Sequence, residues 1–307
     1  MSYNPDMNTW LCFPAQLKSS RLKPAALAAA AVCLAGATQS DDRIHPDTYN
    51  HWVAATPKVL SQAKLDEAVR LHPKSANAYL ERGNGHLTDA EVDNALSDFN
   101  KAIALDPRCA RAYIGLYFVY SDGQHTNQAL AALKKAAEIG PADLSVDALN
   151  LQANLHKDMK NFSLAREEFT RVINSNMLSK VRLALAYKLR GVCNDRLGKI
   201  KEAISDYSNA VKFDPTDGQA YLFRANDCLN LGDLKNAKAG YDYVASQIEH
   251  VSVEKRAPNM ETVRNDLYLF RSEYYRRIKR PDLAKADLAA IKRQQMEDIE
   301  MSPFRDK

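Results

Sequence analysis

The chain is poor in residues that interrupt helices and in residues that form covalent cross-links. Its 307 residues include 11 glycines, 12 prolines and five cysteines. So few helix-breaking residues favour a mostly helical protein. The cysteines are scattered and form no Cys-x-x-Cys pair, so they do not make a disulfide framework. We expect Cys193 and Cys228 to be buried free thiols.

The sequence also lacks a strong net charge and a membrane-length apolar run. A formal charge of +4 is small for this length and does not favour a nucleic-acid partner. A composition of 46% hydrophobic and 26% charged residues is ordinary for a folded chain. The apolar stretch 24–37 has 14 residues, fewer than the about 20 that a bilayer-spanning helix needs.

This apolar stretch has the layout of an export signal. Lys18, Arg21 and Lys23 precede it, and it ends in the small residues 35–37. The pattern predicts cleavage after Ala37 and therefore an exported protein, periplasmic or extracellular. The alternative is an alanine-rich helix that stays in a cytoplasmic protein.

A period near 34 residues dominates the rest of the chain. The runs 99–107 and 133–141 lie 34 residues apart and end in Pro107 and Pro141, and the run 207–215 has the same pattern. Such a period is typical of stacked helical hairpins. We place the proline at the thirty-second place of each repeat. The repeats are then 76–109, 110–143, 146–179, 184–217, 218–251 and a sixth that starts near 265.

Each repeat has residues of a similar kind at the same places. The first has Gly83 at the eighth place, Ala95 at the twentieth and Phe99 at the twenty-fourth. Two small residues let the paired helices approach, and the aromatic residue fills the gap to the next hairpin. The turns between helices contain Gly198, Gly232 or Asn161, which tolerate a positive φ.

These residues together resemble the tetratricopeptide repeat family over about 76–296. The resemblance implies an all-α fold, a right-handed superhelical solenoid of antiparallel helix pairs, with about six repeats and a degenerate one before them. Stacked hairpins share one continuous core. Tyr117 departs from the pattern because it stands where a small residue is expected, so we expect the second hairpin to splay or shift.

The sequence divides the chain into seven segments. They are an export signal (1–37), a linker or N-terminal cap (38–57), a degenerate half repeat (58–75), five repeats (76–251), an insertion (252–264), the sixth repeat (265–296) and a polar tail (297–307). The insertion is either a loop or an extended helix end, and we expect the tail to be frayed.

In the family that the chain resembles, a partner binds the inner surface of the superhelix. That surface is lined by the second, fifth, ninth and twelfth places of the first helices. The resemblance implies the following partner-binding residues: Asn77, Asn84, Arg111, Phe118, Asn150, Asn154, Lys157, Lys188, Asp195, Asn226, Glu273 and Arg276. Asparagine recurs, and its amide both donates and accepts, which suits a peptide backbone. The alternatives are contact with a folded protein, and polar residues that only face solvent.

A basic cluster lies in the sixth repeat. It comprises Arg271, Arg276, Arg277, Lys279 and Arg280. The cluster is a candidate contact for an acidic protein or an anionic membrane surface, although a membrane is not the favoured partner. The alternative is an ordinary solvated helix face.

No catalytic motif is present, and we expect no enzyme activity, no cofactor and no metal site. The sequence predicts an interaction protein that holds a peptide or protein in its concave face. One alternative is an assembly or scaffold factor of a membrane or envelope complex, which docks through the ends of the stack and the basic sixth repeat. Another is a regulatory subunit of an envelope enzyme.

Overall fold

The computed structural model describes residues 61–121, 125–249 and 258–300. These residues form helices and no strands, as the sequence predicts. The export signal at 1–37 and the linker at 38–57 lie outside the described residues. The helices are α3 (Gln62–Leu71), α4 (Ala76–Thr88), α5 (Val92–Leu105), α6 (Ala110–Tyr120), α7 (Thr126–Ile139), α8 (Ala142–Asp158), α9 (Phe162–Asn174), α10 (Lys180–Arg196), α11 (Ile200–Phe213), α12 (Gly218–Asn230), α13 (Leu234–Glu249), α14 (Pro258–Arg277) and α15 (Pro281–Glu300).

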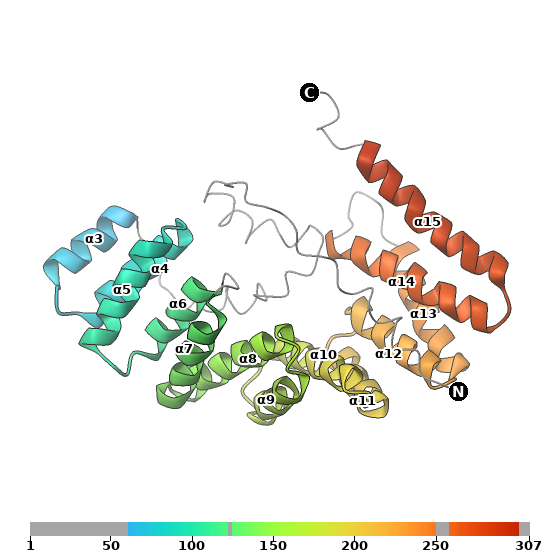
Figure 1. The fold of residues 1–307 in the computed structure, drawn as a ribbon, viewed down its shortest axis with the longest axis horizontal. Helices are drawn as coiled ribbons and strands as arrows, with labels where there is room; N and C mark the ends of the chain where they lie inside the picture. Colours follow the sequence, from blue (N-terminus) through green and yellow to red (C-terminus); the bar gives the residue numbers. More distant parts are fainter. Residues whose placement is uncertain (1–60, 122–124, 250–257, 301–307) are drawn as a thin grey trace.

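The helices pair in chain order and stack into a curved row (Figure 1). Each of the six repeats supplies a first and a second helix, from the pair α4 and α5 to the pair α14 and α15. Figure 1 shows α8 and α10 toward the hollow of the curve, with α9 and α11 outside them. The helix α3 packs against α4 and lies within the segment 58–75, where a degenerate half repeat is predicted.

A left-handed residue ends the turn of every hairpin whose turn is described. It always stands at the fifteenth place of the repeat. These residues are Ala90 (φ 57°), Lys160 (φ 61°), Gly198 (φ 71°), Gly232 (φ 82°) and Lys279 (φ 58°). The prediction for Gly198 and Gly232 is confirmed, but that for Asn161 is wrong, because its φ is −80° and Lys160 takes the left-handed conformation.

The close approach within a hairpin is made between the eighth and twenty-fourth places, and not, as predicted, between the small residues at the eighth and twentieth, because the ring at the twenty-fourth place lies nearest to the glycine. A Cβ atom on Gly83 would lie 2.8 Å from Phe99 Cε1, and one on Gly191 would lie 2.7 Å from Tyr207 Cε1. Phe99 also touches the next repeat, because a Cβ on Gly115 would lie 2.6 Å from its ring. The aromatic side chain therefore fills the space between hairpins, as predicted.

The second repeat exchanges the large and small residues of this contact. Tyr117 occupies the eighth place and is 2% exposed, and it packs with Ala129 and Leu133 in one buried cluster. Leu133 replaces the aromatic residue that the first and fourth repeats have at the twenty-fourth place. The smaller leucine leaves room for the tyrosine ring inside the hairpin.

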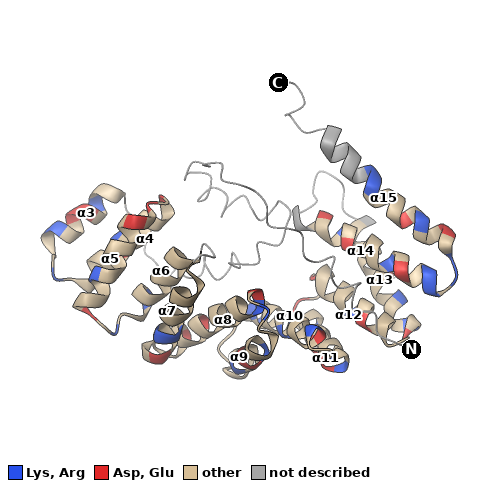
Figure 2. Cartoon of the chain, viewed as in Figure 1, with Lys and Arg blue, Asp and Glu red and all other residues tan. Residues whose placement is uncertain are grey.

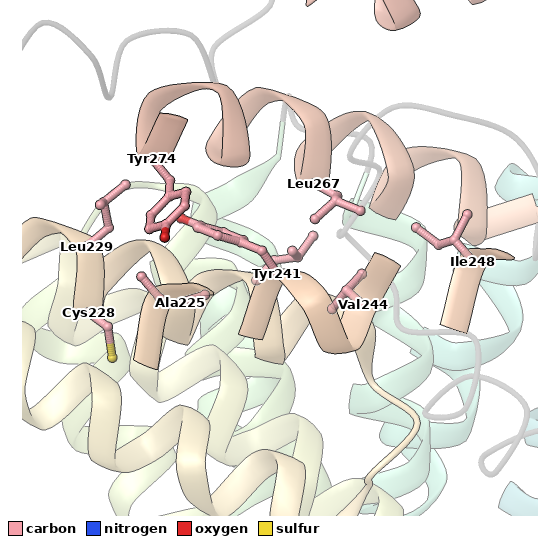
Figure 3. Close-up of a cluster of buried hydrophobic side chains, with 10 residues drawn as sticks. Ala225, Cys228, Leu229, Tyr241, Val244, Ile248, Leu267 and Tyr274 are labelled. Atoms are coloured by element: carbon pink, nitrogen blue, oxygen red, sulfur yellow. The ribbon is translucent and has the colours of Figure 1, made fainter. Parts of the chain in front are cut away.

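The C-terminal boundaries differ from the predicted ones. The helix α14 starts at Pro258, so residues 258–264 of the predicted insertion are an extended helix end. The helix α15 continues to Glu300, which lies inside the tail predicted to be frayed. The early start of α14 is explained by packing, because α14 contacts both α12 and α13. Figure 3 shows Leu267 and Tyr274 of α14 against Tyr241 of α13, in a buried cluster.

Candidate functional site

The candidate site is the inner face, which we define as the surface formed by the first helices α4, α6, α8, α10, α12 and α14 (Figure 1). The twelve predicted residues all lie on these helices. They do not form one uniform polar surface. Asn77 and Arg276 are exposed, and Asn84 and Asn226 are half-buried. The other eight residues are buried or half-buried.

The strongest unmet hydrogen-bonding capacity lies in the first two repeats. Asn84 is half-buried, and neither its Oδ1 nor its Nδ2 atom has a partner among the described residues. Arg111 on α6 lies 3.4 Å from Glu81 through Nη1, while its buried Nη2 atom has no partner there. Buried polar atoms without partners are costly, so these groups are suited to a ligand that donates and accepts hydrogen bonds.

The third repeat contributes polar side chains that are buried in the protein itself. Asn150, Asn154 and Lys157 are 7–8% exposed, and Phe118 of the second repeat is 9% exposed. Asn154 Nδ2 donates to the Asn150 carbonyl at 2.9 Å. The expectation that these places face solvent is wrong for Phe118, Asn150, Asn154 and Lys157, because their side chains are buried.

Lys188 links the fourth and fifth repeats. Its Nζ atom lies 2.9 Å from Asp217 Oδ2 and 3.4 Å from Gln219 Oε1. Gln219 also hydrogen bonds to Asp266 on α14, whose pKa burial raises to about 6. Lys188 is therefore already engaged by carboxylate and amide groups, and it contributes to the stacking of repeats as well as to the inner face.

Asp195 on α10 and Asp227 on α12 influence each other's ionisation. Asp227 is 2% exposed. Burial and the neighbouring Asp195 raise the pKa of Asp227 to about 8. Sequence reasoning selected Asp195 and missed Asp227.

Most of the basic cluster is neutralised inside the sixth repeat. Arg271 forms two hydrogen bonds to Asp287, at 3.0 and 2.7 Å. Glu273 pairs with Arg276 at 3.2 Å and with Arg277 at 3.3 Å, and Arg280 pairs with Asp282 at 2.8 Å. Figure 2 shows acidic and basic residues interleaved on α14 and α15. The cluster, whose fifth member Lys279 is exposed, is thus not an uncompensated positive surface.

Sequence reasoning also missed a repeated ion pair between the seventh and twenty-third places. Arg82 pairs with Asp98, Arg190 with Asp206 and Arg271 with Asp287, each sixteen residues apart. We call these the hairpin ion pairs. The constant spacing within the repeats was a signal that could have revealed them. They join the two helices of one repeat and belong to the scaffold.

Within the described ranges, no group of three or more histidine, cysteine or acidic residues is arranged to hold a metal ion. Across those same residues, none of the helices combines the length and apolar character needed to cross a membrane. Cys193 and Cys228 are buried free thiols, as expected.

No family model matches the chain. Among curated proteins, the chain is 34% identical over 84 residues to human DnaJ homolog subfamily C member 7, covering 27% of this chain and 17% of that protein. It is 36% identical over 77 residues to the small glutamine-rich tetratricopeptide repeat-containing protein 2 of Saccharomyces cerevisiae, covering 25% and 22%. The chain therefore spans less than a quarter of the length of these relatives.

Solved structures with the same fold cover more of the chain. The type IV pilus biogenesis factor PilW superimposes with a TM-score of 0.55 and 14% identity, over 74% of this chain and 95% of that one. Pseudomonas aeruginosa PilF gives 0.54 and 17%, over 75% and 93%. YrrB, described as a TPR protein with an unusual peptide-binding site, gives 0.50 and 21%, over 60% and 91%. The predicted tetratricopeptide-repeat-like solenoid is confirmed.

Proposed function

We propose that this tetratricopeptide-repeat-like chain is a non-enzymatic protein-interaction module that holds an extended peptide segment of a partner on its inner face. The observation that carries the proposal is Asn84, whose amide is buried and lacks a hydrogen-bond partner among the described residues. A peptide backbone offers a carbonyl and an N–H group, which together satisfy both halves of that amide.

Two further features support a peptide as the ligand. The unpartnered Nη2 atom of Arg111 offers a donor on the neighbouring first helix. Curated relatives include a tetratricopeptide repeat-containing protein, and the structural neighbour YrrB is described as having a peptide-binding site. The alternative of docking through the basic sixth repeat has less support, because Arg271, Arg276, Arg277 and Arg280 hold acidic partners.

The test is a pull-down from native extract with the full chain as bait, beside Asn84→Ala and Asn100→Ala variants. Asn100 is an exposed asparagine on α5, a second helix, and is the matched control. We expect partner affinity to fall about tenfold with Asn84→Ala, since two hydrogen bonds of about 0.5–1.5 kcal/mol each are lost. Asn100→Ala retains the partner.

A photoreactive amino acid at the exposed Asn77 position then tests whether the captured segment is a peptide. We expect the cross-link to map to one short stretch of the partner. A partner that survives Asn84→Ala and cross-links only from the sixth repeat contradicts the inner-face proposal and favours the docking alternative.

Export of the chain remains part of the proposal and has its own test. The basic residues, the apolar stretch and the small residues that end at Ala37 support it. N-terminal sequencing of the protein from its native host is expected to start at residue 38. A native protein that retains residues 1–37 contradicts this proposal and leaves peptide binding unaffected.

A further inference from the structure

Half of the exposed leucine, valine and methionine side chains in the described ranges stand where hairpins turn. They occupy the fourteenth or the seventeenth place of a repeat, on either side of the left-handed residue at the fifteenth place. These side chains are 38–51% exposed, and they belong to Val92, Met159, Leu197, Leu231 and Leu234. Exposed apolar side chains therefore concentrate at the turns of the stack.

The turns of the third to sixth repeats have a common pattern. We define the turn edge as the fourteenth to seventeenth places of these repeats, which are residues 159–162, 197–200, 231–234 and 278–281. Each of these turns has an apolar residue at both of its outer places. The turn of the first repeat differs, because it carries the acids Asp89 and Glu91. The turn of the second repeat lies partly outside the described residues.

The four turns of the turn edge follow one another along the stack. The second helix of each repeat packs against the first helix of the next, which joins α9 to α10, α11 to α12 and α13 to α14. Arg277, directly before the sixth turn, donates to the Leu229 carbonyl at 2.6 Å and to Asn230 Oδ1 at 3.4 Å. These two acceptors directly precede the fifth turn. The exposed apolar side chains therefore form a row along one edge of the stack.

Basic side chains stand between the apolar residues of the turn edge. They are Lys160, Lys199, Lys279 and Arg280. The single acid at these places is Asp233, and it already accepts hydrogen bonds from the backbone N–H of Asn236 at 3.1 Å and from Asn236 Nδ2 at 2.6 Å. Neither Lys199 nor Lys279 has an acidic ion-pair partner among the described residues. The turn edge therefore keeps positive charge available to a partner.

Exposed apolar side chains with lysines between them suit the chemistry of an anionic bilayer surface. The apolar side chains enter the headgroup region, while the flexible lysines reach the lipid phosphates. A folded partner would need a separate hollow for each apolar side chain, whereas lipids rearrange around them. We propose that the turn edge docks the protein on an anionic membrane surface. The inner face, which the first helices form, then remains open to a peptide.

A photoreactive amino acid in place of Leu231 tests this contact in the full chain. The purified protein is irradiated with vesicles of phosphatidylcholine and phosphatidylglycerol in equal parts, and its lipid adducts are measured by mass spectrometry. The matched control carries the same amino acid in place of Val181, which is 57% exposed but lies at the start of α10, opposite the turn edge. We expect about tenfold more lipid adducts from position 231 than from position 181. Residues 1–37 are present in both proteins, so binding through them is common to both.

Two pairs of substitutions then test the charge, each in the protein with the photoreactive amino acid at position 231. Lys199→Gln together with Lys279→Gln is expected to reduce the lipid adducts about tenfold, because each lysine attracts anionic lipid. Lys180→Gln together with Lys212→Gln is the matched control, because both lysines are exposed and lie at the opposite ends of α10 and α11. We expect this control to leave the adducts unchanged.

Three results would overturn the proposal. They are equal adduct yields from positions 231 and 181, adducts to a second copy of the chain in place of lipid, and an unchanged yield after Lys199→Gln together with Lys279→Gln. None of them affects the peptide-binding proposal, because Asn84 lies on the inner face and outside the turn edge.

Discussion

Arg190 on α10 and Asp206 on α11 form two parallel hydrogen bonds, Nε to Oδ2 at 3.0 Å and Nη2 to Oδ1 at 2.6 Å. Two-point arginine–carboxylate contacts fix both the distance and the orientation of the partners. The same geometry recurs in the other hairpin ion pairs, at Arg82–Asp98 and Arg271–Asp287. Three of the six repeats therefore have the same polar link between their own two helices.

Replacement of Arg190 by methionine is expected to destabilise the protein by about 3 kcal/mol, measured by chemical denaturation. The reason is that Asp206, whose side chain is 4% exposed, would remain buried without its base. The matched control is Arg224→Met, because Gly240 occupies the twenty-third place of that repeat. Arg224 stacks on Tyr221 at 5.1 Å, so we expect a loss of about 1 kcal/mol or less. Equal losses of unfolding free energy in Arg190→Met and Arg224→Met would show that the ion pair does not contribute to stability.

Gly191→Ala tests the contact between the eighth and twenty-fourth places. The new Cβ would lie 2.7 Å from Tyr207 Cε1, and Tyr207 is 2% exposed with no room to retreat. We expect a loss of about 1–3 kcal/mol in unfolding free energy. Tyr207→Leu in the same chain is expected to recover part of this loss, since Leu133 accommodates the large Tyr117 in the second repeat. If the changes in unfolding free energy caused by Gly191→Ala and Tyr207→Leu simply add, the two side chains are not in contact and the prediction is wrong.

Ala90→Gly is expected to stabilise the protein by about 0.5–1 kcal/mol. Ala90 has φ 57°, a conformation in which a side chain costs about 1–2 kcal/mol and glycine costs little. The control is Asp89→Gly, because Asp89 has φ −86° and gains nothing from glycine. Thermal unfolding of both variants measures the difference. A lower melting temperature for Ala90→Gly would contradict the prediction.

The stability of the protein relative to Asp227→Asn is expected to depend on pH. The pKa of Asp227 is about 8 in the folded protein and about 3.9 in the unfolded chain, so the folded state binds more protons between these values. The contribution of Asp227 is therefore complete below about pH 4 and is lost as pH rises to about 8. Between these pH values, the difference in unfolding free energy between the two proteins changes by at most about 1.4 kcal/mol per pH unit. Above about pH 8, the difference no longer changes with pH. Chemical denaturation of both proteins at several pH values measures this difference. A difference in unfolding free energy that stays constant with pH would contradict the prediction.

Much of the fold was predictable because the repeated residues act locally. The period near 34 residues, the prolines and the small residues at the eighth place determine where hairpins begin, approach and end. The error at Asn161 shows the limit of this reasoning. The chain reverses at the fifteenth place of the repeat whatever residue stands there, so Lys160 adopts φ 61° although asparagine has the higher local preference.

The candidate site was less predictable than the fold. Family positions located the inner face and selected Asn84 and Asp195. They did not distinguish a side chain open to a ligand from one enclosed by its neighbours, such as Asn154 or Lys157. That distinction depends on how far each first helix lies from the next, which no single repeat encodes.

The sequence by itself determined the all-α class, the number of hairpins and the places where helices cross, because these follow from composition, periodicity and side-chain size within one repeat. Only the tertiary structure decided which polar groups find partners. Asp206 meets Arg190 within its own hairpin, whereas the pKa of Asp227 is raised by burial and by Asp195 of another hairpin. The physical reason is that electrostatic interactions depend on separation and burial in space, and stacking sets both between residues that are distant in the chain.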